Sequence, residues 1–526
     1  MKIILMFFAL SVFFFTSLYS QNNTAWIRTL DGPFNYWDES KVIAVDDSGN
    51  VYSSGFTIVG GNYICDFMTA KYDNFGNLKW VKTLDWFSYD VGENMLLGKD
   101  GNIIISGTDE GVFTLLKYSP GGDLLWKTYS PGHIRNSIVL DDSGNIYLAG
   151  QQDYKSVLVK FNSDGVKQWE RIYSGPAENF ARTSSLTRDK AGFIYIAGCT
   201  NTFTGNSILL MKYNPSGDTI WTKIWGDSLD GNEISAITAD NFCNIYIAGY
   251  TSKNFQPINP IVLKYDSSGT LLWSISNNPA GSRSGQWKKI SLDKNNNVYL
   301  AGDAEIPGHR WDFIISKFNT DGDSIWTTTF NGTANNNDYL YDMIMDNSTN
   351  IYCTGGAFDL FGGWNCVTIM YDSSCQQRAI QRFNGNGNSE DEGFSIALDK
   401  WNNVFVGGRT LDSVNSFDYL LIKYGENLTE IKESKTNQPN KLSLYQNYPN
   451  PFNPSTTIKF KIPKTTHVTL KIYNILGQEV AELVNEEIKP GVYNINWNAS
   501  NIASGVYFYR LKVGDFIKTN KMIITK

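Results

Sequence analysis

The chain is poor in the residue types on which catalysis and metal binding most often depend. It has 3 histidines in 526 residues, and its 6 cysteines form no Cys-x-x-Cys pair and no zinc-type spacing to histidine. No Gly-x-Ser-x-Gly, His-Glu-x-x-His or glycine-rich phosphate loop occurs. We therefore predict no catalytic residue, no metal site and no cofactor, and expect a protein that is not an enzyme. Cys353, Cys366 and Cys375 lie in one stretch, where either a local disulfide or buried free thiols are expected.

Positive charge and long apolar runs are also scarce. The net charge is −7, and because residues 441–526 carry an excess of six positive charges, residues 1–440 have a net charge of −13. An acidic body argues against a nucleic-acid partner. Lys2 followed by the apolar run Ile3–Leu18 predicts an export signal at residues 1–20, cleaved after Ser20. No later segment is apolar enough to act as a transmembrane anchor once the signal is removed.

A pair of hairpins, repeated along the chain, is what the sequence has in abundance. In Ser137–Gly150, apolar residues flank the turn sequence Asp141–Asn145, whose Asp, Ser, Gly and Asn suit a tight turn. A second strand–turn–strand unit follows and ends at Trp169. Two hairpins in series predict a four-stranded antiparallel sheet.

The repeat has eight copies between residues 22 and 424. Its first turn ends at Asn50, Asn102, Asn145, Phe193, Asn244, Asn297, Asn350 and Asn403. The intervals between these positions are 52, 43, 48, 51, 53, 53 and 53 residues. Four strands at such a period predict an eight-bladed β-propeller.

The two ends of the repeat region complement each other. The eighth copy stops at Tyr424 without its last strand, and Ala25–Leu30 resembles the closing strand of the other copies. The N-terminal strand is therefore predicted to complete the last blade, which removes the open sheet edge.

Long, dissimilar loops follow the second and fourth strands, and they are where a ligand is expected. We predict four ligand-face aromatic residues in these loops: Trp86, Trp287, Trp311 and Trp364. Trp can stack on a sugar ring or anchor a protein partner; the alternative is that these side chains merely cover the blades. The function expected is binding of an extracellular glycan or surface protein. The alternative is a glycan-degrading propeller hydrolase or lyase.

Two recurring polar positions also have competing interpretations. The first comprises Asp38, Asp90, Asn232, Asp338 and Asp391. These residues either surround a cation or cap backbone amides between blades, and capping is favoured because no Asp-x-Asp-x-Asp-Gly loop is present. The second is the Lys of a repeated Lys-Tyr pair, for which a structural role is expected.

A different kind of sequence follows a polar linker at residues 425–440. Residues 441–526 contain short alternating strands with Pro and Gly punctuation, typical of a small β-sandwich. Its motif residues are Tyr448, Pro449, Asn450, Pro451, Phe452 and Asn453. With Tyr473–Val480 and the Gly-Val-Tyr runs at 491 and 505, they closely resemble the type A C-terminal sorting domain of type IX secretion. The resemblance implies handling by the type IX machinery of a Gram-negative bacterium, and passage through the periplasm to the outer surface or medium.

The repeats themselves resemble the bacterial SBBP-type β-propeller family, with Asp-x-x-Gly-Asn-(Ile/Val)-Tyr followed by Lys-(Tyr/Phe)-(Asp/Asn)-x-x-Gly and Trp. The seventh copy departs from this pattern at Met370, Cys375 and Ala379, and the fourth at Phe193. The resemblance implies an extracellular scaffold without an agreed activity. The fold class expected is all-β, with an eight-bladed propeller and a C-terminal sandwich.

Overall fold

The computed structural model contains two compact units, Met1–Glu430 and Ile431–Lys526. It describes residues 24–32, 36–60, 64–84, 90–109, 112–176, 180–201, 206–226, 230–253, 257–276, 278–359, 363–385, 390–411, 416–425, 442–445, 447, 450–462, 464–488, 491–500, 502–514 and 516–525. The expected export signal, nearly all of the expected linker, and the predicted residues Trp86, Tyr448 and Pro449 lie outside these ranges.

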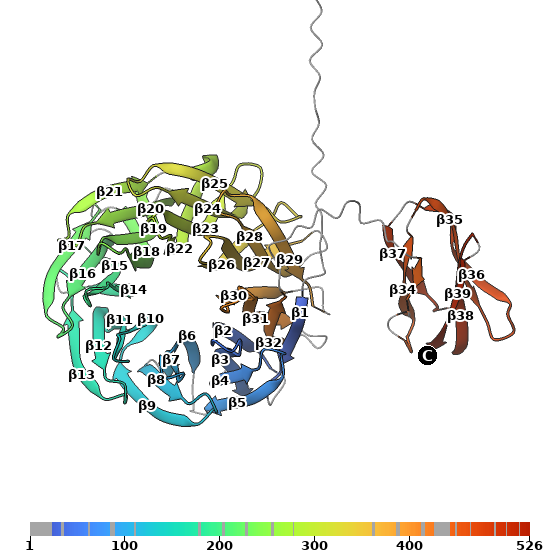
Figure 1. The fold of residues 1–526 in the computed structure, drawn as a ribbon, viewed down its shortest axis with the longest axis horizontal. Coiled ribbons are helices and arrows are strands. Elements are labelled where there is room, and N and C mark those ends of the chain that lie inside the picture. Colours follow the sequence, from blue (N-terminus) through green and yellow to red (C-terminus); the bar gives the residue numbers. More distant parts are fainter. Residues whose placement is uncertain are drawn as a thin grey trace, which may run out of the picture. The chain divides into compact units, whose positions relative to one another are not determined.

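The first unit is built from four-stranded antiparallel blades that lie around a common centre, as in a β-propeller (Figure 1). Two adjacent blades, β14–β17 and β18–β21, are joined into one eight-stranded sheet by a parallel pairing of Asn206 with Gly231. The innermost strands are β2 (Asp38–Val45), β6 (Val91–Leu97), β10 (His133–Leu140), β14 (Ala181–Arg188), β18 (Asp230–Ala239), β22 (Ser284–Leu292), β26 (Asp338–Met345) and β30 (Asp391–Leu398). The second strands are β3 (Val51–Gly60), β7 (Ile103–Asp109), β11 (Ile146–Gln152), β15 (Ile194–Asn201), β19 (Ile245–Lys253), β23 (Val298–Glu305), β27 (Ile351–Phe358) and β31 (Val404–Leu411).

The outer half of each blade completes the sheet. The third strands are β4 (Ile64–Tyr72), β8 (Val112–Tyr118), β12 (Lys155–Phe161), β16 (Asn206–Tyr213), β20 (Asn259–Tyr265), β24 (Trp311–Phe318), β28 (Trp364–Tyr371) and β32 (Phe417–Tyr424). The fourth are β5 (Leu78–Leu84), β9 (Leu124–Pro131), β13 (Lys167–Tyr173), β17 (Thr219–Trp225), β21 (Leu271–Ser276), β25 (Ser324–Phe330), β29 (Gln377–Phe383) and, from the N-terminus, β1 (Thr24–Leu30). A short 3-10 helix, η1 (Pro279–Gly281), follows β21.

Turn chemistry explains the repeated Asp-x-x-Gly-Asn sequence. In the first copy, the Asp46 carboxylate accepts hydrogen bonds from the backbone N–H groups of Ser48 and Asn50, both at 2.9 Å. Gly49 has a φ of +76°, a conformation that a Cβ atom disfavours. The Tyr52 hydroxyl donates to the same carboxylate at 3.1 Å and ties the turn to the second strand.

Neighbouring blades are joined by a Lys and a Trp that donate to one backbone carbonyl. The Nζ atom of Lys71 and the Nε1 atom of Trp80 both reach the carbonyl oxygen of Pro120, at 2.9 and 3.2 Å. The same joint uses Lys117 and Trp126 on Ser163, Lys212 and Trp221 on Ser267, and Lys264 and Trp273 on Thr320. The repeated Lys therefore has the structural role that the sequence predicted.

The predicted pairing of the N-terminal strand is confirmed. Strand β1 pairs antiparallel with β32, from Thr24 opposite Tyr424 to Leu30 opposite Tyr419. Trp26 of β1 and Lys423 of β32 then donate to the carbonyl of Asn74 in the first blade, each at 3.1 Å. The joint at the chain ends is thus made like the joints inside the repeat.

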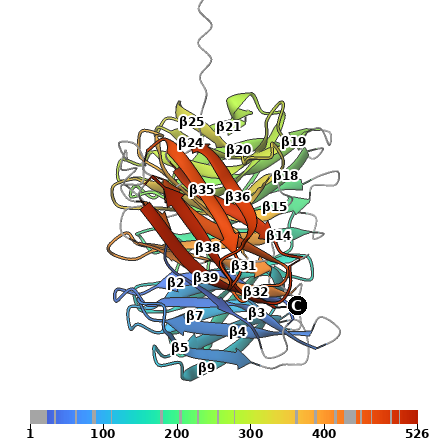
Figure 2. The same cartoon turned by 90° about the vertical axis from the view of Figure 1, so that its right-hand side faces the viewer.

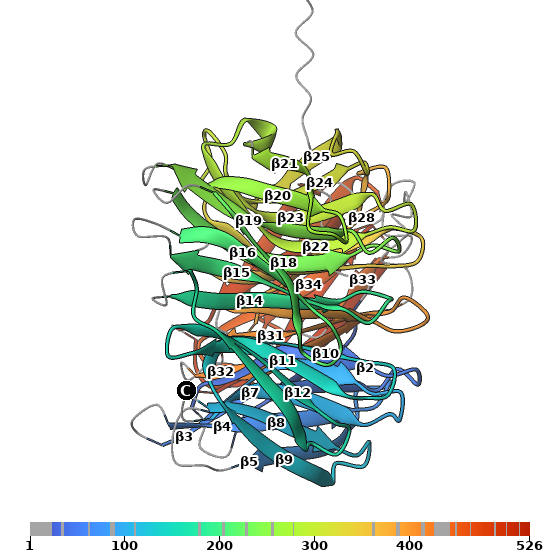
Figure 3. The ribbon, with the colours of Figure 1, turned by 90° about the vertical axis from the view of Figure 1, so that its left-hand side faces the viewer.

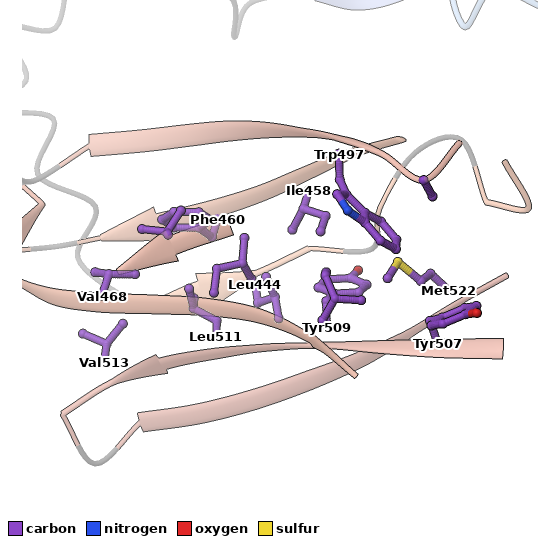
Figure 4. Close-up of a cluster of buried hydrophobic side chains, with 14 of the residues drawn as sticks. Leu444, Ile458, Phe460, Val468, Trp497, Tyr507, Tyr509, Leu511, Val513 and Met522 are labelled. Atoms are coloured by element: carbon purple, nitrogen blue, oxygen red, sulfur yellow. The ribbon is translucent and has the colours of Figure 1, made fainter. Parts of the chain in front are cut away.

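The second unit consists of two antiparallel sheets with a shared core. Its strands are β33 (Ser443–Leu444), β34 (Ser455–Ile462), β35 (Thr466–Tyr473), β36 (Glu479–Ile488), β37 (Gly491–Asn498), β38 (Gly505–Val513) and β39 (Phe516–Ile524). One sheet has the order β33-β34-β37 and the other β36-β35-β38-β39. Buried side chains from both sheets, among them Phe460, Trp497 and Tyr509, form the core (Figure 4).

The cysteines and the helix content bear on two further expectations. All six cysteines are free, and Cys353 and Cys366 are buried, so the structure contains no disulfide in the seventh copy.

Within the part of the chain that the structure describes, no helix has the length and apolar character needed to cross a membrane.

Candidate functional site

The connections of the propeller gather on two opposite edges, because the strands run across its thickness (Figures 2 and 3). The tight turns after first and third strands share one edge; a Cβ atom on Gly49, in the first turn, would lie 3.0 Å from Asn74 in the second. The connections after second and fourth strands lie on the opposite edge, which we name the loop edge. It is the predicted ligand face.

Three neighbouring blades place an aromatic residue at the same position of the loop edge. Trp311, Trp364 and Phe417 are the first residues of β24, β28 and β32, and all three are half-buried. The sequence prediction included the two tryptophans and missed Phe417, although its place in the repeat is the same. Tyr36, which is 48 % exposed, and the half-buried Trp37 lie between β1 and β2.

Trp287 does not belong to this surface. It lies within β22, is 2 % exposed, and packs in the apolar core between two blades. A side chain buried in this way cannot stack on a ligand, so the prediction of a ligand-facing Trp287 is wrong. The direction of the Trp287 side chain could not be predicted from the sequence. Neighbouring residues of a strand point to opposite faces of the sheet, so a shift of one residue in the predicted start of the strand changes which of them is buried.

A connected set of aromatic and charged side chains runs along the innermost strands from β22 to β2. We name it the arc: Lys288, Tyr339, Trp364, Tyr341, Glu392, Phe394, Arg409, Phe417, Trp37 and Glu39. At one end Trp364 stacks on Tyr339 with 5.3 Å between ring centroids and 16° between ring planes. Lys288 lies 5.6 Å from the Tyr339 ring and 5.4 Å from that of Tyr341.

Arg409 is the centre of the arc. Its Nη1 atom lies 2.6 Å from Oε1 of Glu39 and its Nη2 atom 2.6 Å from Oε2 of Glu392. The guanidinium also lies 4.2 Å from the Phe417 ring and 5.3 Å from that of Trp37. Burial lowers the pKa of Arg409, but the two carboxylates outweigh burial and hold the pKa above its ordinary value. The guanidinium is therefore a permanent cation, and it lies between the carboxylates of Glu39 and Glu392.

Neutral donors complete the hydrogen bonding of these carboxylates. The Tyr341 hydroxyl donates to Oε1 of Glu392 at 2.8 Å, and the indole N–H of Trp37 donates to Oε1 of Glu39 at 3.1 Å. Phe394 lies against Tyr341 with a centroid separation of 5.1 Å. The arc is thus a connected network of ion pairs, hydrogen bonds and ring contacts whose aromatic members reach the loop edge, although Nε of Arg409 has no hydrogen-bond partner.

A histidine–carboxylate pair lies on the same edge. Nδ1 of His309 is 2.9 Å from Oδ2 of Asp312, which is fully buried. Burial raises the pKa of Asp312. Burial, with the charge of Asp312 as a further cause, raises the pKa of the nearby Asp338 to about 7. The sequence does not indicate that these three residues lie close together, because Asp338 belongs to the repeat that follows the one containing His309 and Asp312.

At three of the five recurring positions, Asp38, Asp338 and Asp391, the side chain caps a backbone amide between blades, as the sequence favoured. Asn232 instead donates its amide to the carbonyl of Asn206 at 2.7 Å. Oδ2 of Asp391 accepts the N–H of Gly385 at 2.7 Å, and Asp338 accepts the N–H of Gly332, which also lies six residues earlier. Oδ2 of Asp38 accepts the N–H of Gly32 at 2.6 Å.

The described residues of the sorting motif hold the last strand of the second unit. Oδ1 of Asn450 accepts the N–H of Ile523 at 2.8 Å, and Phe452 exchanges backbone hydrogen bonds with Ile523 and Thr525. The Phe452 side chain is buried 5.8 Å from the Trp497 ring. Pro451 and Asn453 flank it in the same segment. The motif therefore has a structural part, which fixes β39 against the core.

Comparison with known proteins identifies the second unit and supports the fold of the first. Residues 446–525 match the family described as the secretion system C-terminal sorting domain. No curated protein matches the chain. The solved Dos1 propeller is 9 % identical and has a TM-score of 0.50, covering 76 % of this chain and 95 % of that one. This likeness concerns the β-propeller fold alone.

Two further solved structures are similar at lower scores. PorZ, described as an essential surface component of the type-IX secretion system of Porphyromonas gingivalis, is 12 % identical over 91 % of this chain and 68 % of that one, with a TM-score of 0.40. YCF48 bound to D1 peptide is 10 % identical over 78 % and 99 %, with a TM-score of 0.41. The sorting tail itself shows that the chain is handled by type IX secretion and is secreted or displayed on the outer surface.

Proposed function

We propose that this protein is a non-enzymatic surface scaffold that binds an extracellular glycan or surface protein at the loop edge of its propeller. The observation that carries the proposal is the shared position of Trp311, Trp364 and Phe417 on three neighbouring blades. Aromatic rings of this kind stack on sugars or fill a partner's pocket. Trp364 and Phe417 are held within the arc by the Tyr339 ring and the Arg409 guanidinium, and such preorganisation lowers the entropy lost on binding.

The state of the nearest carboxylates favours binding over hydrolysis. Glycoside hydrolysis requires one carboxylic acid that can donate a proton and a second, ionised carboxylate. Glu39 and Glu392 both bind Arg409 at 2.6 Å, and Glu392 also accepts the Tyr341 hydroxyl at 2.8 Å. Both carboxylates are therefore engaged within the arc and are not presented to a substrate.

A glycan array tests the binding proposal. The purified secreted chain is applied to extracellular polysaccharides, and both retention and newly formed reducing ends are measured. We expect retention without new ends, weakened at least tenfold by W311A or Y36A. The control is W401A, because Trp401 is 52 % exposed at a tight turn on the opposite edge. Equal loss with W401A, or no retention by any polysaccharide, contradicts glycan binding; a surface protein then becomes the ligand to test.

A hydrolase or lyase is the second candidate, favoured by the His309–Asp312 pair. A histidine oriented by a buried carboxylate can act as a general base. The same array distinguishes the two functions, because new reducing ends that disappear in H309N assign catalysis to this pair. Retention without new ends supports the scaffold.

The finer architecture also belongs to this proposal. We infer a closed ring of eight blades made of SBBP-type repeats, followed by a β-sandwich sorting module. The pairing of β1 with β32 and the repeated Lys–Trp joints support the ring. The sorting module is tested by deleting residues 441–526, which should trap the propeller in the periplasm. Normal surface display of the truncated chain contradicts this role.

A further inference from the structure

Three carboxylates meet on the loop edge where the two ends of the propeller join. Asp31 follows β1, Asp38 begins β2, and Asp418 is the second residue of β32. One carboxylate oxygen of each residue lies within 4.8 Å of the corresponding oxygens of the other two. Two oxygens that share one Ca²⁺ at 2.3–2.6 Å are at most about 5 Å apart, so all three residues can bind a single ion.

The environment of Asp38 is the second observation that indicates a cation. Its side chain is fully buried, and while Oδ2 accepts the N–H of Gly32, Oδ1 has no hydrogen-bond partner. The Thr57 hydroxyl, also fully buried, is the neighbouring donor, but it makes no hydrogen bond of normal geometry. A buried carboxylate oxygen without a well-placed donor is unfavourable, and a bound cation would satisfy it.

The repeat supplies an internal comparison for this oxygen. In the equivalent Asp338, Oδ1 accepts the backbone N–H of Phe358 at 3.0 Å. The corresponding N–H in the first blade belongs to Ile58 and donates instead to the carbonyl of Trp37 at 3.0 Å. The first blade thus lacks the backbone donor that Asp338 has. The eighth blade makes the same backbone bond, from Leu411 to the carbonyl of Glu390, but there the Thr410 hydroxyl donates to Oδ1 of Asp391.

We propose that Asp31, Asp38 and Asp418 bind one Ca²⁺ that fastens the N-terminal strand and the last blade to the first. Ca²⁺ fits an all-oxygen site assembled from separate segments better than Mg²⁺, which requires near-ideal octahedral geometry. An extracellular module of this kind typically has a Kd of about 10⁻⁴–10⁻³ M. A local calcium motif is absent because the ligands come from both ends of the propeller, and the sequence accordingly predicted no metal.

The test compares calcium binding and thermal stability in the purified, chelator-treated secreted chain. Calorimetric titration with CaCl₂ should give a half-saturation in the range above, and the Tm should rise by several degrees between EDTA and 5 mM CaCl₂, since a ligand that binds the folded state stabilises it. In D418N the calcium response should disappear. Its Tm in EDTA should equal or exceed that of the unaltered chain, because the substitution removes a repelling charge; this shows that the variant folds.

The matched control is D66N. Asp66 lies opposite Thr57 in the first blade as Asp418 lies opposite Thr410 in the last, but outside the three-residue group. We expect D66N to keep the full calcium-induced rise in Tm. The proposal is overturned if the unaltered chain shows neither binding heat nor a rise in Tm, if D418N keeps the rise, or if D66N abolishes it.

Discussion

At the scale of single residues, the ion pairs of Arg409 are expected to contribute more to stability than ion pairs on the surface, because they are buried. Its partner Glu39 is 2 % exposed, whereas Lys99 and Asp142 form their ion pair with side chains 79 % and 75 % exposed. Water screens the surface pair almost completely. Around Arg409 the aromatic rings exclude water, so the carboxylates depend on the guanidinium.

Replacing Arg409 by alanine is therefore predicted to destabilise the propeller strongly. R409A removes the cation that binds the buried Glu392 and leaves Glu39 with Lys41 alone, and breaking a buried pair from one side costs about 3–5 kcal/mol. K99A should change the free energy of unfolding by no more than about 1 kcal/mol. Urea denaturation of both variants checks the difference, and a loss in R409A as small as that in K99A would show that the arc is solvated.

Asp338 gives the molecule a pH dependence with a definite sign. Its folded pKa is about 7, raised mainly by burial, further by Asp312 and opposed by Arg382, while the unfolded value is about 3.9. Between these values the folded state holds a proton that the unfolded state has lost, so stability falls as pH rises. We expect the Tm to decline from about pH 4 to pH 7 from this cause. The decline should be smaller in D338N, and parallel Tm profiles for both proteins would contradict the assignment.

At the scale of elements, six joints between blades depend on a glycine that lets a turn rest on a tryptophan, whereas Cys375 takes this position, with a φ of +71°, in the seventh blade. Gly122 has a φ of +92°, and a Cβ atom there would lie 2.9 Å from the Trp80 ring of the preceding blade. Gly101, in the first turn of the same blade, has a φ of +75° but no atom closer than 3.6 Å to such a Cβ. An alanine at either position would therefore strain the backbone, but only an alanine at position 122 would also clash with the tryptophan of the neighbouring blade.

The two glycines therefore form a matched pair of substitutions. G101A should cost about 1 kcal/mol through its left-handed conformation. G122A should cost that amount and about 1–3 kcal/mol more, because the turn must move off Trp80. Urea denaturation measures the free energy of unfolding of both variants. Equal values would mean that the turn at Gly122 is not packed tightly against Trp80.

The seventh repeat departs from the sequence pattern for a reason that only the structure shows. Met370 and Ala379 stand where other copies have Lys and Trp. In the structure, those two residues face the last blade, whose fourth strand β1 comes from the N-terminus. No turn connects β32 to β1, so that blade has no carbonyl for a Lys and a Trp to bind. The departure follows from where the ring closes.

At the scale of the whole molecule, the pairing of β1 with β32 predicts that the N-terminal strand is as important for stability as an internal strand. Trp26 and Trp80 occupy equivalent joints, each donating an indole N–H to a carbonyl of the next blade. W26A and W80A should consequently lower the Tm by similar amounts, several degrees each. Thermal unfolding of both variants is the measurement. An unchanged Tm in W26A with a clear loss in W80A would place the N-terminal strand outside the ring.

Much of this protein is determined locally and can be predicted from the sequence. Each hairpin turn is specified by neighbouring residues, as Asp46, Gly49 and Asn50 specify the first one. The period of these turns led to the propeller, and the unpaired end strands to the pairing of β1 with β32. The match to the sorting domain likewise rests on a contiguous motif at residues 446–525.

The tertiary structure decided what depends on residues far apart in the chain. The burial of Trp287, the ion pairs of Arg409 and the meeting of Asp31, Asp38 and Asp418 all arise between blades or between the chain ends. The repeat sequence determines how strands pair within one blade. Contacts between blades instead bring together side chains from two different repeats, and no local sequence pattern predicts such contacts, because they form only when the blades pack against each other.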